Sequence, residues 1–382
     1  AARPLPAAGA GPRGLLAPPH VPRASSARRR AAPEWALTAP AAAGVVGCVC
    51  LAGAAASQLL QGHGRGKKRK ADRRLVAPRP PAPPASPRGP AAAGGPCYEL
   101  RARPGKGLGV VALRDVREGE LVHSEAPVIS YSPCETDAFA WVEDVNGQFL
   151  KLPEDKQEAV MALADSFQKQ RSRKSIIGIL RTNSFMRGTG STDGVLCPAA
   201  ARFNHSCSPN CEQSWDDDAN ALEIYASTHI LRGEELTVFY VDPRGSKVQR
   251  RVGFRGFGFQ CRCPICHADD VEGDRNRGRM AEIVRTIGKV RSENPQRALE
   301  MAIEALRLYE KEGIHTNAFR KAACHNAAVV SDKLGEEAVA REWAGAAVAY
   351  SRLCHGRSHR ETKRLVDFVA GLKRNPLEQS SW

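Results

Sequence analysis

Large hydrophobic side chains are scarce in the first quarter of the 382-residue chain. Residues 1–94 consist mainly of Ala, Pro, Gly and Arg, and they hold 15 of the 26 prolines. A segment with so little to bury cannot offset the conformational entropy lost on folding, so we expect it to be disordered. The apolar stretch 41–60 within it has little Leu, Ile or Phe, so it does not favour a membrane-spanning helix.

Net charge is nearly absent from the rest of the chain. The whole sequence carries +15, but residues 1–94 hold 15 Lys and Arg against two acidic residues, which leaves +2 for residues 95–382. The basic charge therefore belongs to the tail and says nothing about a substrate of the folded part. It predicts either a weak contact with nucleic acid or a targeting signal.

Two targeting interpretations of this tail remain open. Residues 1–33 are rich in Arg, contain Ser and lack acidic residues, as a mitochondrial presequence does, whereas residues 66–70 resemble a nuclear import patch. A solvated basic linker is the simpler alternative. The sequence does not begin with Met, which leaves open whether residues 1–94 are genuine mature sequence. We expect the protein in the nucleus or the cytoplasm, with mitochondrial targeting as an alternative.

A persuasive secretory signal is also missing, so the twelve cysteines favour reduced thiols or metal ligands over a disulfide framework. Three of them form a C-x-C-x-x-C run, at Cys261, Cys263 and Cys266. Three thiolates leave a tetrahedral zinc site one ligand short. Cys207, in an irregular loop, is the best candidate for the fourth ligand, and Cys211 and His267 are alternatives. A closed four-sulfur site would be structural, with no open position for a substrate.

The remaining sequence divides into a β-rich part and a helical part. Strands are predicted at 110–113, 121–123, 222–226 and 235–240, with turns at 117–120 and 232–234. Residues 135–180 look like a helical insert, in which Pro153 sits at the start of a helix. From about residue 275 the pattern is wholly helical, with helices up to Gly313 and then over 317–334, 336–353 and 360–372. We predict an α+β fold with a β-rich domain at 95–270 and an all-α, tetratricopeptide-like domain at 271–382.

Glycines concentrate in the run 104–110 around Lys106. They let a backbone approach a ligand closely, although the same run is first of all a good turn before a strand. It is neither a Rossmann loop nor a P-loop, because no strand precedes it and no capped helix follows.

Two further segments concentrate polar and aromatic residues. In the loop 202–210, the Asn204-His205 pair can contact the polar edge of an adenine, although an isolated His is more often structural. The segment 233–240 reads as a turn followed by a strand that ends in Tyr240. By pattern alone, such a tyrosine is more typical of a core residue than of a catalytic one.

Taken together and in this order, these segments resemble a SET domain: the glycine-rich loop, R-F-N-H-x-C-x-P-N at 202–210, G-E-E-L-T-x-x-Y at 233–240 and the cysteine run at 261–266. The resemblance covers about residues 97–268, and the segment 182–185 is similar to a further cofactor-contacting strand that contains Asn. The nearest subgroup is the SET-and-MYND methyltransferases and the fungal SET proteins like them. A MYND zinc module is not expected, because the insert 135–180 contains no cysteine.

The resemblance implies a protein-lysine methyltransferase that acts on a histone or another protein. We expect a monomer. S-adenosylmethionine would be the methyl donor, in a pocket lined by Lys106, Gly107, Leu108, Asn183, Asn204, His205 and Phe259. Tyr240 would be the catalytic tyrosine, and it would line the lysine channel together with Phe257. One structural zinc in the post-SET segment 257–268 would be held by Cys207, Cys261, Cys263 and Cys266.

Two residues depart from the pattern of the family. Phe257 stands where many relatives have a second tyrosine, so one hydroxyl that would hold the amine or a water is missing. Val252 and Gly253 stand where relatives usually carry leucines. The alternative function is therefore a catalytically weak SET scaffold that binds protein or chromatin partners through its helical domain and basic tail.

Overall fold

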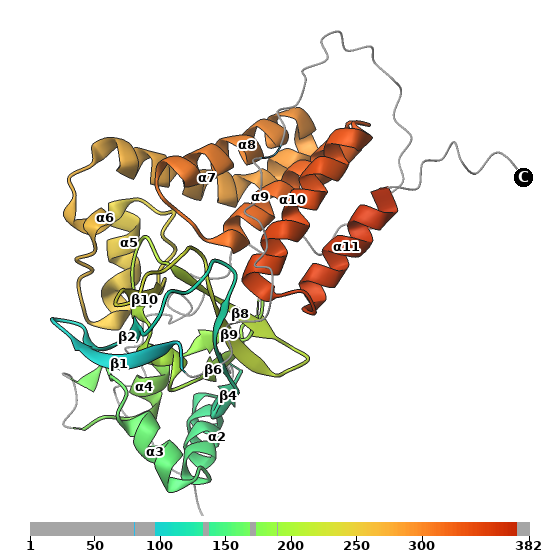
Figure 1. Cartoon of the computed structure of the whole chain (residues 1–382). Helices are drawn as coiled ribbons and strands as arrows, with labels where there is room; N and C mark the ends of the chain where they lie inside the picture. The colour runs from blue at the N-terminus through green and yellow to red at the C-terminus, as the bar shows by residue number, and fades with distance from the viewer. Residues whose placement is uncertain (1–79, 81–95, 133–136, 169–172, 189, 373–382) are drawn as a thin grey trace, which may run out of the picture. The chain divides into compact units, whose positions relative to one another are not determined.

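The computed structural model describes residues 80, 96–132, 137–168, 173–188 and 190–372 (Figure 1). Apart from Pro80, the tail predicted over 1–94, with its apolar stretch and basic patch, lies outside these residues. In the described part, no helix is both long enough and apolar enough to cross a membrane. The fold is α+β, as predicted, with short strands followed by a run of helices.

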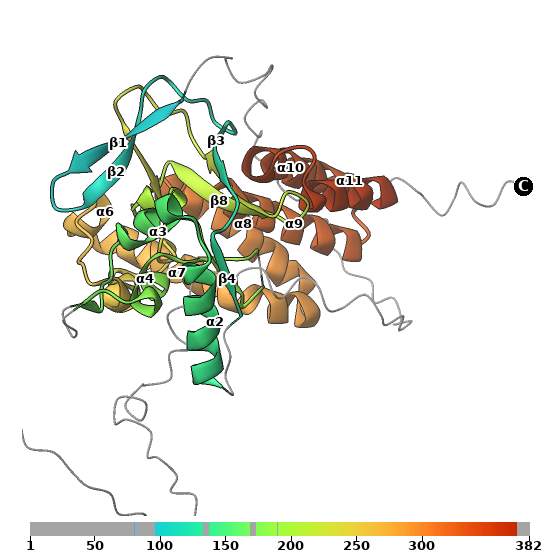
Figure 2. The same ribbon diagram turned by 90° about the horizontal axis from the view of Figure 1, so that it is seen from below.

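Three small sheets make up the β-rich part. The first has the order β1 (Tyr98–Arg103), β2 (Gly107–Ala112), β10 (Glu235–Val238) and β7 (Asn204–His205). The second has the order β3 (Leu121–Glu125), β9 (Ala221–Ala226) and β8 (Cys211–Asp216), and the third has β4 (Ile129–Tyr131), β6 (Gly194–Leu196) and β5 (Phe185–Met186). Figure 2 shows β1 and β2 side by side as an antiparallel hairpin. The first sheet joins strands that are distant in sequence, because β10 lies between β2 and the parallel β7.

The insert is helical, as predicted, and consists of α2 (Ala138–Leu150), α3 (Glu154–Met161) and α4 (Ile176–Asn183). Asp137 starts α2 by accepting hydrogen bonds from the first backbone N–H groups, and Ser175 does the same for α4. Pro153 precedes the first turn of α3 and is its N-cap residue, so it lies one position before the place predicted.

A second helical region follows the strands. Beyond the short α5 (Lys247–Gly253), η5 (Phe254–Phe257) and α6 (Pro264–His267), it contains α7 (Val271–Glu293), α8 (Pro295–Lys311), α9 (Asn317–Lys333), α10 (Glu337–His355) and α11 (Arg360–Leu372). Asn294 ends α7, and its side chain caps α8 by accepting from the N–H of Arg297 at 3.1 Å. Figure 1 shows α7, α8, α9 and α10 packed side by side, and their buried faces form one apolar core.

Polar contacts attach these helices to strand β8. The buried carboxylate of Glu212 accepts hydrogen bonds from the N–H groups of Asn317 and Ala318 at 3.0 and 2.9 Å, so it caps the N-terminus of α9. The hydroxyl of Ser214 lies 2.6 Å from Nδ1 of His355. Because these side chains project from one strand, β8 is one part of the β-rich region that holds the helices.

Two details of the predicted elements are wrong. The strand expected over 235–240 ends at Val238, so Tyr240 lies in the irregular segment that follows. Asn183 does not lie in a strand but ends helix α4, where its amide donates to the carbonyl of Ile179 at 2.7 Å. This bond to the residue one turn earlier satisfies the side chain within the helix, and strand β5 begins two residues later.

Candidate functional site

Strand β7 brings the Asn-His pair to the segment that carries Tyr240. Asn204 and His205 pair in parallel with Thr237 and Val238 of β10. Two residues after β10 ends, the backbone N–H of Tyr240 donates to Nδ1 of His205 at 2.9 Å. The imidazole therefore fixes the backbone of the predicted catalytic residue.

His205 is a buried, neutral side chain. Burial, together with the charges of Arg250 and Lys106, lowers its pKa to about 3, although Cys263 acts in the opposite direction. Because Nδ1 accepts from a backbone N–H, the ring proton is on Nε2, which lies 3.2 Å from Sγ of Cys207. One ring thus connects the Tyr240 segment to the cysteine cluster.

The four predicted metal ligands come together in the structure. The sulfur atoms of Cys207, Cys261, Cys263 and Cys266 all lie within 4.8 Å of one another. Among the described residues, these four side chains are the group close enough together to hold a metal ion. The two alternative ligands, Cys211 in β8 and His267, do not belong to the group. Hydrogen bonds among the thiols lower the pKa of Cys263 and raise that of Cys207, so the four sulfur atoms lie close enough to share protons.

Two buried arginines flank this cysteine cluster. Arg250 donates to Sγ of Cys266 at 3.8 Å, and Arg277 donates to the carbonyl of Cys207 at 3.2 Å. Each side chain is only 1% exposed. Four thiolates around Zn²⁺ carry a net charge of −2, which two adjacent guanidinium groups can balance in a low-dielectric setting. The donor set and its surroundings therefore fit a closed, structural zinc site.

A polar cluster surrounds Glu235, the first residue of β10. Its carboxylate accepts from Nδ2 of Asn204 at 2.8 Å and pairs with Lys106 at 2.9 Å and Arg103 at 3.4 Å. Burial acts to raise the pKa of Glu235, but the bonds from Asn204 and Lys106 and the charge of Arg103 hold it below its usual value. Sequence reasoning missed this residue, although its place in the Gly-Glu-Glu turn was a usable signal.

The glycine-rich loop is the turn between β1 and β2, so a strand does precede it and the sequence interpretation was wrong on this point. Because a strand and not a helix follows, the loop is still neither a Rossmann loop nor a P-loop. Gly105 and Gly107 have φ angles of 71° and 75°, which favour glycine. At Gly109 a Cβ atom would lie 2.6 Å from Nδ2 of Asn204, so the glycine allows β2 to approach the Asn-His strand. Next to it, the side chain of Leu108 is 44% exposed, and its carbonyl accepts from Asn204 at 3.2 Å.

Aromatic rings surround Tyr240. The ring centroid of Phe257 lies 5.3 Å from that of Tyr240, and the ring of Phe259 packs edge-on at 6.3 Å. Phe254, which sequence reasoning missed, contacts His205 at 4.7 Å and Phe259 at 5.3 Å. These rings form an apolar surround for the phenol, with Phe259 still 40% exposed.

The hydroxyl of Tyr240 donates to the backbone carbonyl of Phe203 at 2.8 Å. Burial, and to a smaller extent the charge of Glu235, raises the pKa of Tyr240 above its ordinary value. The group is therefore a neutral phenol at pH 7. With its proton directed at Phe203, its oxygen keeps lone pairs that can accept a hydrogen bond.

Asn183 stands apart from the other predicted cofactor residues. Its amide donates to the carbonyls of Ala164 and Ile179. The link from α4 to the site is its neighbour Thr182, whose hydroxyl lies 3.0 Å from that of Ser166, which in turn donates to the carbonyl of Gly256 at 2.8 Å.

Gly253, the other departure noted in the sequence, has a packing reason. A Cβ atom at this position would lie 2.6 Å from a methyl group of Val241, next to Tyr240. The glycine therefore lets α5 approach the segment after β10 closely. No function of the neighbouring Val252 follows from its exposed position.

Comparisons with known proteins agree with this geometry. The model of the SET domain family matches residues 107–241. The chain is 24% identical to histone-lysine N-methyltransferase set5 of Schizosaccharomyces pombe over 56% of this chain and 66% of that protein. It is 28% identical to histone-lysine N-methyltransferase SMYD3 of Mus musculus over 37% of each chain, and 30% identical to SET domain and MYND-type zinc finger protein 6 of Schizosaccharomyces pombe over 31% of this chain and 24% of that protein.

The matches thus span just under two thirds of the first relative and about a third or less of the other two. The range matched by the family model contains the Gly109 strand, the Asn204-His205 strand and Tyr240. Residues 107–241 therefore match the SET domain family, which is the part of the chain that this comparison covers.

Proposed function

We propose that this protein transfers a methyl group from S-adenosylmethionine to the side chain of lysine in a protein substrate, in the nucleus or the cytoplasm. The match to the SET domain and the names of the relatives as histone-lysine N-methyltransferases support this class of reaction. The single observation that carries the proposal is the neutral phenol of Tyr240, which is half-buried among aromatic rings and whose backbone N–H is held by His205.

Lys106, Gly107, Leu108, Asn204, His205 and Phe259 are the residues that would hold the methyl donor. The fit rests on the close approach that Gly109 permits, on the polar groups of Asn204 and Lys106, and on the exposed apolar surfaces of Leu108 and Phe259. Asn183 would act on this group only indirectly, since the contact from α4 to the site runs through its neighbour Thr182 and Ser166. When bound, S-adenosylmethionine supplies a methyl group on a positively charged sulfur.

Tyr240 would orient the attacking amine. Its proton is engaged by the carbonyl of Phe203, so the phenol oxygen can accept a hydrogen bond from an amine N–H. An acceptor in this position fixes the direction of the nitrogen lone pair without taking a proton from it. The contribution of the residue is therefore positioning, which can account for a large part of a rate enhancement.

The rings of Phe254, Phe257 and Phe259 would keep the amine neutral. A free lysine has a pKa near ~10.4, so at pH 7 the ammonium form must lose its proton before it can act as a nucleophile. An apolar surround disfavours the charged form, which lowers the pKa of the bound lysine and excludes competing water.

Phe257 favours a second candidate, a SET scaffold with little activity. Its ring packs on Tyr240 but offers no hydroxyl to hold an amine or a water. Such a protein would bind the methyl donor and protein partners while transferring methyl groups slowly or not at all.

One experiment separates the two candidates. Purified protein is incubated with radiolabelled S-adenosylmethionine and either histones or cell extract, and the labelled peptides are identified by mass spectrometry. The enzyme predicts labelled lysines, and the spectra report the target and the number of methyl groups together. Binding of the donor in a calorimeter without any labelled product would contradict the proposed enzyme and favour the scaffold.

A further inference from the structure

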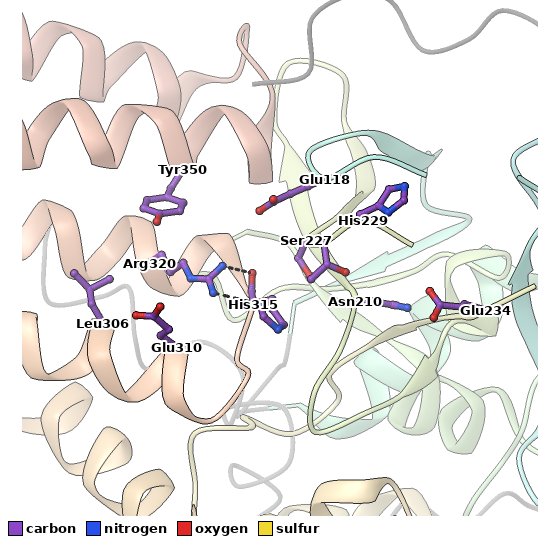
Figure 3. A pocket seen from close by; sticks show the side chains of 11 residues that line it. Glu118, Asn210, Ser227, His229, Glu234, Leu306, Glu310, His315, Arg320 and Tyr350 are labelled. Atoms are coloured by element: carbon purple, nitrogen blue, oxygen red, sulfur yellow. Dashed lines mark hydrogen bonds between the residues drawn. The ribbon is translucent and has the colours of Figure 1, made fainter. Parts of the chain in front are cut away.

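A pocket with a volume of about 600 Å³ lies away from Tyr240, between the SET strands and the helical region (Figure 3). One wall is formed by the turn before β3 and by the segments around β9 and β10, and the other by α8, α9 and α10. Its principal polar residues are Glu118, Ser227, Glu234, Glu310, His315 and Arg320. A volume of this size is in the range of ligand pockets, and it exceeds what a single side chain fills.

Negative charge predominates in this pocket. Glu118, Glu234 and Glu310 are three carboxylates, and Arg320 is the only Lys or Arg among the described residues that line it. The guanidinium of Arg320 is already engaged, because it lies 3.1 Å from the carbonyl and 3.3 Å from Nδ1 of His315. Burial, assisted by Arg320, lowers the pKa of His315, so this imidazole adds no positive charge at pH 7.

Two of the carboxylates are not in a direct ion pair, although Arg320 is near enough to Glu118 to act on its pKa. Within the described part of the chain, neither Glu118 nor Glu310 forms an ion pair within 4.0 Å. Figure 3 shows the carboxylate of Glu118 directed toward the helical wall, where Arg320 and Tyr350 lie. Burial raises the pKa of Glu118, and the neighbouring Asn317 and Arg320 offset this only in part. A partly buried carboxylate without an ion-pair partner is stabilised by any cation that enters the pocket.

Ser227 gives an independent sign that a polar ligand belongs here. It lines the pocket and is only 1% exposed, yet its Oγ has no hydrogen-bond partner among the described residues. An unsatisfied buried hydroxyl is destabilising, so natural proteins seldom retain one without a reason. A donor from a ligand would satisfy it.

We propose that this pocket binds a short basic segment of a protein partner, with a Lys or Arg side chain directed at Glu118 and Glu310 and hydrogen-bonded by Ser227. The proposal rests on the proposed function, because a protein substrate is the partner that the reaction requires. The pocket is a docking site outside the lysine channel. It shares β10 with the residues around Tyr240, since Glu234 precedes Glu235 directly and Asn210 donates to the carbonyl of Glu235 at 2.9 Å.

The test is a binding titration that needs no methyl transfer. The full chain is titrated against a fluorescein-labelled nine-residue peptide of alternating Arg and Gly, and the anisotropy is recorded. The peptide contains Arg rather than Lys, so that its binding does not depend on a lysine side chain entering the channel beside Tyr240. We expect saturable binding that weakens about tenfold when Glu118→Gln and Glu310→Gln are combined, and less when Ser227→Ala is introduced alone.

Matched controls remove charge elsewhere or invert the ligand. The variant that combines Asp155→Asn and Glu158→Gln loses two exposed carboxylates from α3 and should bind the peptide like the wild type. A peptide of alternating Glu and Gly should not bind. Two results would overturn the proposal. One is that the pocket double variant and the α3 double variant bind the Arg peptide with equal affinity. The other is that the acidic peptide binds more tightly than the Arg peptide and that Arg320→Gln abolishes this binding. Neither outcome bears on methyl transfer, which is measured separately with extract proteins, so the docking site and the proposed function can fail independently.

Discussion

His205 and Tyr240 are joined by a hydrogen bond of 2.9 Å from the backbone N–H of the tyrosine to Nδ1 of the imidazole. The other ring nitrogen lies 3.2 Å from Sγ of Cys207. A displacement of the cysteine cluster therefore reaches the segment of the phenol through one rigid ring. This contact connects the candidate zinc site, which has no open position of its own, to the position of the candidate catalytic residue.

The first prediction concerns the phenol oxygen. Tyr240→Phe removes the acceptor that would orient the amine, so we expect methyl transfer to fall by about 100-fold or more. The bond to Phe203 is lost as well, which lowers the free energy of unfolding by about 1 kcal/mol. The rate is measured with a radiolabelled donor, and the affinity for the donor, measured by calorimetry, should not change.

Tyr98→Phe is the matched control, because it removes a phenol that bonds to His123 at 2.8 Å outside the aromatic surround of Tyr240. Its methyl transfer should equal that of the wild type. If both variants lose activity alike, the role assigned to Tyr240 is wrong.

The second prediction concerns the metal. Purified protein should contain one zinc ion per chain, as measured by elemental mass spectrometry. The Cys263→Ser variant should contain no zinc. Because binding of a structural zinc contributes about 10 kcal/mol or more to folding, we expect the melting temperature to fall by at least about 10 °C. Cys211→Ala should retain the metal, since Cys211 lies in β8 outside the cluster. Zinc-free protein that keeps its fold in a strong chelator contradicts this site.

The third prediction concerns Arg277 of α7. Its guanidinium donates to the carbonyls of Cys207, Pro243 and Glu312, so one buried side chain joins the cysteine loop, the segment after Tyr240 and the helical region. Arg277→Met leaves three carbonyls without this donor and removes a charge beside the thiolates. We expect a loss of about 3 kcal/mol in the free energy of unfolding and faster hydrogen exchange in the 241–246 segment.

Arg275→Met on the exposed side of the same helix is the control and should be within about 0.5 kcal/mol of the wild type. Arg277→Lys keeps the charge but offers a single nitrogen, so it should fall between the two. A stability of Arg277→Met equal to that of the control would show that the three bonds are not needed.

The sequence predicted those parts of the fold that depend on local pattern. The Asn294-Pro295 pair marks the start of α8, and the apolar period of α7 to α11 places each helix to within a few residues. The cysteine spacing likewise indicated the residues that the fold brings together, because Cys261, Cys263 and Cys266 are close in sequence and their donor type suits one metal.

Contacts between distant segments could not be predicted in this way. Glu235 meets Lys106 across two strands that pair only in the folded sheet, and Arg277 reaches Cys207 from 70 positions away. The motif places Asn183 in a strand, but helix α4 extends through this residue, and its side-chain amide donates to the carbonyl of Ile179 in the same helix. In each case the missing information is tertiary pairing.

The last prediction concerns Glu212, the buried carboxylate that caps α9. Burial raises its pKa to about 7, and this outweighs the opposing effect of the two N–H groups that it accepts from. A raised pKa means that the folded state binds the proton more tightly than the unfolded state does. The stability that this group contributes is therefore complete below a pH of about 4.5 and is lost as the pH rises through about 7.

Glu212→Gln should remove that dependence, so that between pH 5 and pH 8 the variant gains up to about 3 kcal/mol relative to the wild type in urea unfolding. Glu337→Gln changes a half-exposed carboxylate in the first turn of α10, paired with Arg341, and should leave the pH dependence as it is. If Glu212→Gln follows the wild type at both pH values, the carboxylate is not titrating in this range, and the attachment of the helices to β8 does not depend on its protonation.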